Sequence, residues 1–236
     1  MKNRDVFSGR ILRNAIGAAA VLAFLSTLLI SQEIARQGSP LATITFTLDF
    51  PQSNPEHYSI AVDSTGHTRF ECKTETDDQT YRSEFELSAG TRDRIFNWSK
   101  QAKYFSESID SANRKLAFSG AKILSYEDSA HNYTQHYNYS NLAPVRDLTN
   151  FFQNLASTLE FGRRLTYDHR YQKLALDDEL KRMEDQARNN ELTEIQSINP
   201  VLESIVEDES VMNIVRARAR ELMKIGSNAT SAQSQH

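Results

Sequence analysis

A single cysteine, Cys72, stands in this chain of 236 residues, so no intramolecular disulfide can form. The motifs G-x-S-x-G, G-x-x-x-x-G-K, H-E-x-x-H and C-x-x-C are also missing. They are typical of serine hydrolases, nucleotide-binding loops, zinc proteases and thiol redox sites, respectively. The sequence therefore gives no reason to name a catalytic residue, a metal ligand, a cofactor-binding residue or a cofactor.

An excess of positive charge is missing as well. The formal net charge is -4 and the isoelectric point is near 5.9, which argues against a surface that binds nucleic acid. Apolar residues make up 39% of the chain, a proportion too high for a disordered protein. We therefore expect a folded core and no nucleic-acid partner.

One long apolar run is present, near the N-terminus. The run AIGAAAVLAFLSTLLI, residues 15–30, follows Lys2, Arg4, Arg10 and Arg13. This layout is typical of a secretory signal or a membrane anchor, and we expect residues 15–34 to form a helix in a membrane. The basic flank predicts a cytoplasmic N-terminus and a body on the other side.

The sequence favours a retained anchor but leaves cleavage open. No small-x-small cleavage site follows the run, which predicts a single-pass membrane protein. If the leader is cut, the body is periplasmic or secreted. Residues 1–40 are therefore interpreted as a signal peptide or membrane anchor with a short linker.

Residues 41–162 predict an α+β domain. Ile44, Phe46, Leu48 and Phe50 alternate with polar residues, which indicates a half-buried strand, and similar alternation recurs later in the chain. We expect an antiparallel sheet of about six or seven strands, one of them at Leu116 and Phe118, with one face in water. Two helices, at 88–105 and from Pro144 to Leu159, should pack on the sheet.

Residues 163–226 predict a helical extension. Residues 165–190 are heavily charged with a narrow apolar seam, and Met212, Val215, Ala219 and Leu222 mark a last helix. We expect these two helices to form an antiparallel hairpin attached through Gly162, with Gly226 ending the last one. Residues 227–236 predict a disordered tail.

Part of this extension resembles a known repeat family. The positions that carry the resemblance are Leu202, Ile205, Asp208, Val215, Arg216, Ala219 and Leu222. Over residues 200–222 the chain is similar to a single helix pair of a HEAT-type solenoid, which implies a docking element. The order of basic leader, small sheet domain and helical tail also resembles that of uncharacterised exported bacterial proteins, a resemblance that implies no activity.

The richest polar cluster lies at residues 131–139. On a strand, His131, Tyr133, Tyr137 and Tyr139 share one face, while His136 lies on the other. This face is either a set of packed tyrosines or an aromatic surface that binds a small ligand. The two histidines do not converge as a metal pair.

Other titratable residues have simple interpretations. Cys72 shares a strand face with Phe70 and is expected to be a buried thiol, although His57 or His67 could in principle activate it. Asp168 and His169 are adjacent on a helix and point about 100° apart, so they do not form a dyad.

Three functions remain open at this point. The first is a non-enzymatic interaction module of the cell envelope, anchored or exported, with a protein partner whose identity the sequence leaves open. The second is an exported hydrolase whose site is not recognisable in sequence. The third is a small-ligand binder that uses the tyrosine-rich strand at residues 131–139, called the tyrosine strand below.

Overall fold

A computed structural model describes residues 41–233, except 52, 75, 76 and 114. The predicted leader, with its membrane helix at 15–34, lies outside these residues. None of the helices that are described combines the length and the apolar character needed to cross a bilayer.

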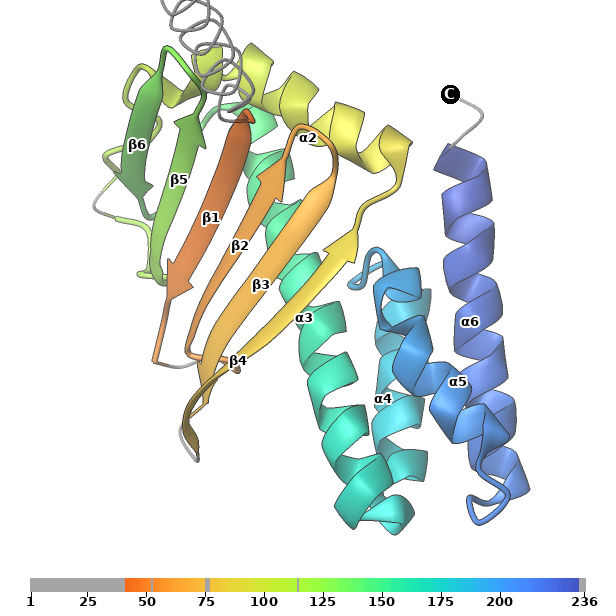
Figure 1. The fold of residues 1–236 in the computed structure, drawn as a ribbon. Helices are drawn as coiled ribbons and strands as arrows, with labels where there is room; N and C mark the ends of the chain where they lie inside the picture. Colours follow the sequence, from red (N-terminus) through yellow and green to blue (C-terminus); the bar gives the residue numbers. More distant parts are fainter. Residues whose placement is uncertain (1–40, 52, 75–76, 114, 234–236) are drawn as a thin grey trace, which may run out of the picture. The chain divides into compact units, whose positions relative to one another are not determined.

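The first part of the described chain forms one antiparallel sheet of six strands, as the sequence predicts (Figure 1). The strand order is β4-β3-β2-β1-β5-β6, so that β1 is central and β4 and β6 are the edges. The strands are β1 (Thr43–Asp49), β2 (His57–Asp63), β3 (His67–Thr74), β4 (Asp77–Glu86), β5 (Ala121–Glu127) and β6 (Asn132–Tyr137).

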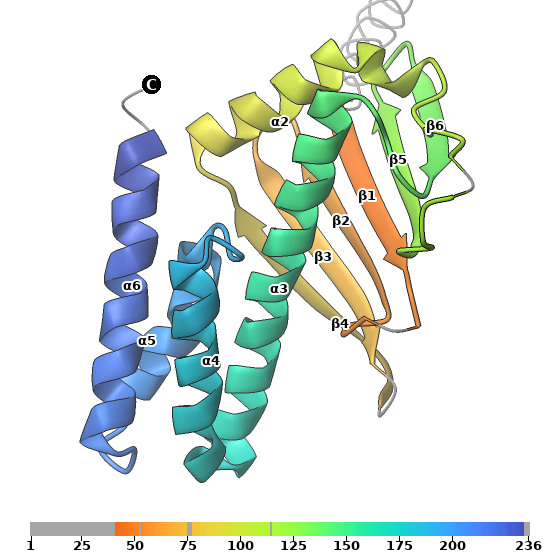
Figure 2. The same cartoon turned by 180° about the vertical axis from the view of Figure 1, so that it is seen from behind.

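Alternation of apolar and polar residues decides which face of the sheet is buried. In β1 every second residue is buried, and Phe46 stacks on Phe152 with ring centroids 5.3 Å apart. The helices α2 (Ala89–Gln101) and α3 (Ala143–Tyr171) cover this face (Figure 2). Ser88 caps α2 by accepting a hydrogen bond from the Thr91 amide, and Pro144 lies in the first turn of α3.

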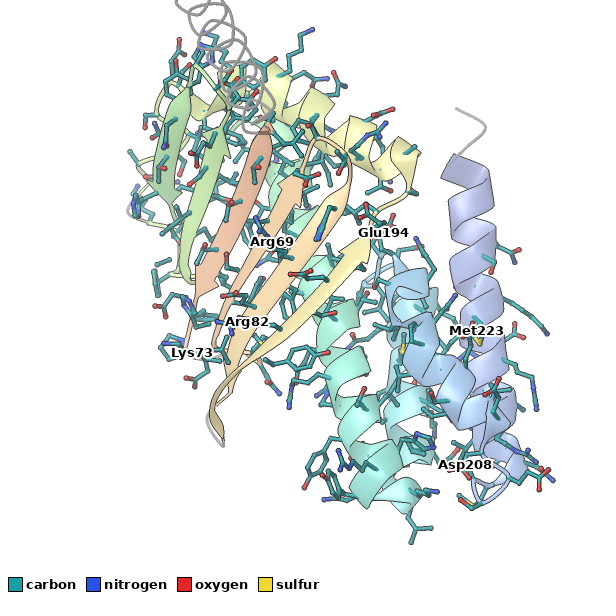
Figure 3. All side chains as sticks on the ribbon, viewed as in Figure 1. Arg69, Lys73, Arg82, Glu194, Asp208 and Met223 are labelled. Carbon is teal, nitrogen blue, oxygen red and sulfur yellow. The ribbon has the colours of Figure 1, made fainter. Side chains whose placement is uncertain are left out.

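The opposite face of the sheet carries polar side chains. Arg69, Lys73 and Arg82 project from it (Figure 3), and Arg82 Nε donates to Glu71 Oε1 at 2.8 Å. A polar face of this kind is expected of an antiparallel sheet with one side in water.

The second part of the described chain is a bundle of helices. It contains the second half of α3 and five further elements, namely η2 (Lys173–Ala175), α4 (Leu176–Arg188), η3 (Ile195–Ile198), α5 (Asn199–Glu207) and α6 (Asn213–Gln233). Their apolar residues join those of the sheet in one continuous core.

The boundary predicted at Gly162 is wrong, because α3 runs through it without a break. Gly162 is buried, and a Cβ added there would lie 2.5 Å from Ile198 Cγ2. The glycine therefore lets the segment before α5 approach α3 closely. It is a packing position inside a helix that belongs to both the sheet layer and the bundle.

The predicted helix at 165–190 is two helices, with the turn at Gln172. The predicted antiparallel pairing of its second part with the last helix is also wrong. Lys173 donates to Asp208 and Ser210, which places the start of α4 beside the start of α6. The two helices therefore run in the same direction, and the short α5, which precedes α6 in the chain, runs the opposite way (Figure 1).

Two further predictions are wrong. Leu116 and Phe118 lie in an irregular loop and not in a strand. Helix α6 continues past Gly226 to Gln233, so the described part of the predicted disordered tail is helical. Gly226 lies against η3, where a Cβ would be 3.3 Å from Ile195 Cβ, which explains the glycine by close packing instead of helix termination.

Candidate functional site

The tyrosine strand β6 has the two faces that the sequence predicts. Tyr133 is half-buried and Tyr137 is buried at 6% exposure, whereas the alternate residues of the strand are exposed. His131 and Tyr139 flank the strand and are exposed. The four candidate residues therefore share a side of the chain, but only Tyr137 belongs to the interior.

The hydroxyl of Tyr137 lies 2.6 Å from Thr149 Oγ1, which itself donates to the Val145 carbonyl at 2.7 Å. Because the threonine proton is directed to Val145, the tyrosine is the donor in this pair. Burial raises the pKa of Tyr137 well above its usual value. Tyr137 therefore fixes β6 against α3.

Tyr137 and Tyr139 also line a cavity of about 380 Å³ between the end of the sheet and the first turns of α3. His131 and Tyr133 do not line it, since His131 pairs with Asp128 at 3.1 Å and stacks near Tyr133 at the far end of the strand. The structure thus divides the predicted cluster into a half that borders a cavity and a half that packs against the turn before β6.

A hydrolase would need a nucleophile beside a base. Cys72 is 1% exposed and lies on the helix-covered face of the sheet, opposite Tyr58 on the neighbouring strand. His57 and His67 occupy the other face, where they approach Asp49 at 3.8 Å and Glu84 at 3.5 Å. Neither histidine can therefore activate the thiol, and burial raises the pKa of Cys72 to about 11.

His169 does not pair with its neighbour Asp168. Its Nε2 lies 2.9 Å from Asp208 Oδ2, and Lys173 Nζ donates to the same oxygen at 2.5 Å. Ser210 donates its amide and hydroxyl to the other oxygen of Asp208. The carboxylate of Asp208 thus lies between Ser210 and His169 and accepts hydrogen bonds from both. These bonds hold the segment after α5 against the end of α3. His169 is therefore not positioned to act as a base for the Ser210 hydroxyl.

Asp208 marks the end of the bundle at which α3 ends and α6 begins (Figure 3). We define the bundle end as residues 167–174 and 208–214. Five of the ten large apolar side chains that are exposed in the described part of the chain lie there. They are Tyr167, Tyr171, Leu174, Met212 and Ile214, and Leu174 is 84% exposed.

Sequence reasoning missed two sets of residues. The first is Lys122, which lines the cavity beside Tyr137. The sequence pattern that could have identified it is its alternation with Leu124 and Tyr126, which places a lysine on the buried face of the strand. The bundle end was missed because its apolar residues come from segments about 40 residues apart that the Asp208 contacts bring together.

Neither a search for metal-binding groups nor comparison with known proteins assigns a function to the described residues. Among the residues that the structure describes, no group of three or more histidine, cysteine, aspartate or glutamate side chains could hold a metal ion. No family model matches the chain, and no curated protein is significantly similar to it. The geometry of the described residues is therefore the basis for the functional proposal.

Proposed function

We propose that the protein is a non-enzymatic interaction module of the cell envelope that docks a protein partner through the bundle end. Its N-terminal residues 15–34 hold it in a membrane as a single-pass anchor, with the body outside the cytoplasm. A body released by cleavage would be periplasmic or secreted and would dock the same partner.

The exposed apolar side chains of the bundle end carry this proposal. Tyr167 and Tyr171 are one helical turn apart on α3, with ring centroids separated by 5.1 Å, and Leu174 follows them in the next turn. Exposed apolar residues that gather in one place mark interaction sites more often than scattered ones. Aromatic side chains are also enriched among the residues that contribute most to binding.

The hydrogen bonds of Asp208 support a docking role because they fix the position of the two apolar segments. The side chains of His169 and Lys173 come from one segment, and Asp208 and Ser210 from the other. A surface whose backbone is already held in place loses less conformational freedom on binding. The HEAT-type resemblance of residues 200–222, which include Asp208 and Met212, implies the same role.

Site-specific crosslinking in the full chain tests the docking proposal. A photoreactive amino acid at Leu174 should give a covalent adduct with one protein in the native membrane. The same amino acid at Leu116, which is also exposed but lies on another part of the molecule, is the matched control. Ile214→Asp should abolish the Leu174 adduct, because it places a charge in the apolar contact.

Identical adducts at Leu174 and Leu116 would contradict the proposal. So would an adduct at Leu174 that survives Ile214→Asp. Circular dichroism of Ile214→Asp checks that the loss does not result from unfolding.

The export proposal has its own test. A reporter that is active only outside the cytoplasm, fused after residue 40, should be active, because the basic flank of the apolar run keeps the N-terminus inside. Activity of a cytoplasmic reporter alone at the same position would refute it. Mass spectrometry of the N-terminal peptide distinguishes a retained anchor from a cleaved one.

A further inference from the structure

A lysine lies at an interior position of the sheet. Lys122 belongs to the buried alternation of β5, is paired with Leu48 on β1 and with Tyr137 on β6, and is 4% exposed. Lysine is among the residues that are least often fully buried, because removing its charge from water costs free energy. Its presence there needs a compensating interaction.

The acceptors around the Lys122 ammonium group are all neutral. Nζ donates to the Ser119 carbonyl at 2.8 Å, to Ser119 Oγ at 2.9 Å and to the Asn138 carbonyl at 3.1 Å, and it lies 3.5 Å from the Gly120 carbonyl. In the described part of the chain, Lys122 forms no ion pair with a carboxylate. Burial accordingly lowers the pKa of Lys122. The hydrogen bonds are satisfied, but the positive charge is not neutralised.

The cavity that Lys122 lines has a second cation. Arg146, from the first turns of α3, lines it as well, and no ion pair involves this residue within the described residues. The amide groups of Asn150 and Gln153 lie on the same wall.

Exposed apolar side chains lie near the cavity. Tyr139 lines the cavity and is 40% exposed, and Leu142 lies two residues after Ser140, which also lines it. Leu116 and Phe118 line an adjoining hollow that shares Asn138 with the cavity. Asp110 also lines that hollow and accepts a hydrogen bond from the Asn138 amide. Among the described residues that line the cavity itself there is no carboxylate, and exposed apolar side chains lie nearby.

We propose that this cavity binds a small organic anion, a carboxylate with an apolar or aromatic body. The carboxylate pairs with Arg146, the buried charge of Lys122 adds to the attraction, and the body packs on Tyr139 and the apolar side chains nearby. A volume of about 380 Å³ falls within the range of small-molecule sites, which begins at about 300 Å³. The proposal is independent of docking at the bundle end, because the two sites share no residue.

Fluorine NMR with the full chain in nanodiscs of zwitterionic lipid tests this inference. The probe is 4-fluorobenzoate, whose signal should broaden on binding with a dissociation constant of about 1 mM, typical of a ligand of this size. The neutral 4-fluorobenzamide has the same shape and should bind about tenfold more weakly, since it lacks the charge. Empty nanodiscs give the background.

Two variants and a matched control locate the site. Arg146→Gln should weaken 4-fluorobenzoate binding about tenfold, because it removes a charge-assisted contact. Lys122→Met should also weaken it, because it removes the positive charge behind the cavity wall. Lys181→Gln removes an exposed cation from α4 and should leave binding unchanged. Arg146 is exposed, so its variant folds even if Lys122→Met does not.

Three results would overturn the inference. The first is no binding of 4-fluorobenzoate above the background of empty nanodiscs. The second is equal binding of 4-fluorobenzoate and 4-fluorobenzamide, which would mean that the negative charge does not contribute to binding. The third is unchanged benzoate binding in Arg146→Gln, which would place the anion elsewhere on the protein.

Discussion

Replacing Gly162 by alanine should destabilise the protein, although alanine favours helix more than glycine does. Gly162 lies inside α3, where the propensity gain is about 1 kcal/mol. Against this, the new Cβ would lie 2.5 Å from Ile198 Cγ2 and 3.2 Å from Ile198 Cβ. Ile198 is β-branched and buried, so it cannot rotate away freely, and overpacking of this kind costs about 2 kcal/mol.

The expected net effect of Gly162→Ala is a loss of about 1 kcal/mol, or about 2 to 4 °C in Tm for a chain of this size. Thermal unfolding followed through Trp98, the single tryptophan, measures it. Trp98 is half-buried on α2, and its ring lies 6.5 Å from that of Phe151 on α3, so its fluorescence reports on the contact between these helices.

A second background removes the cost. In Ile198→Ala the Cγ2 methyl group is gone and only the 3.2 Å contact with Cβ remains, so adding Gly162→Ala should change the unfolding free energy by close to zero. Gly226→Ala is the matched control, because its nearest contact would be 3.2 Å, and its effect should be close to zero. If Gly162→Ala raises Tm in the wild-type background, the close contact between α3 and Ile198 is wrong.

Two further predictions concern Cys72 and Asp208. Cys72→Ala should lower the free energy of unfolding, measured in urea, by about 1 kcal/mol. The wild-type thiol should react with a maleimide only as fast as the protein opens, because Cys72 is buried and its pKa is raised to about 11. Fast labelling of the folded protein would contradict the burial of Cys72. Hydrogen bonds from Lys173, from the hydroxyl and amide of Ser210 and from His169 hold the pKa of Asp208 far below its usual range. The stability that Asp208 contributes should therefore be complete above about pH 4 and decline as the pH falls further toward the lowered folded-state pKa. The difference in unfolding free energy between wild type and Asp208→Asn should narrow over that range, and a difference that does not change with pH would refute the role of the charge.

The sheet was predictable from sequence because its information is local. Alternation of side chains along β1, β2 and β3 assigns the buried face directly, and the turn residues Asp63 to Gly66 end β2 where the structure ends it. The seam from Val145 to Leu159 likewise predicts the covering helix. In these segments each residue's environment follows from its spacing to its neighbours.

Leu116 and Phe118 show why the loops were less predictable. They alternate as strand residues do, but they pair with none of the described strands, and Phe118 packs edge-on against Phe50 with ring centroids 6.0 Å apart. Pairing of strands depends on residues far away in the chain, which alternation within one segment does not report. The aromatic contact with Phe50 is itself such a long-range feature.

The charged helices were misjudged for a different physical reason, and this bears on how the bundle is held. Residues 165–190 were expected to pack only on the last helix, because charges surround a narrow apolar seam. In the structure Glu179 is 2% exposed and pairs with Arg164 of α3 at 2.9 Å. Glu184 is 5% exposed and pairs with Arg218 of α6 at 2.7 Å.

These carboxylates therefore lie in the interfaces of α4 with α3 and α6, where arginines neutralise their charge. Removing one member of such a pair leaves a buried charge without its partner and costs more than the pair itself contributes. A count of charged residues cannot distinguish a solvated helix face from one whose charges are matched across an interface. Because the matching arginines lie on α3 and α6, α4 is held on both sides.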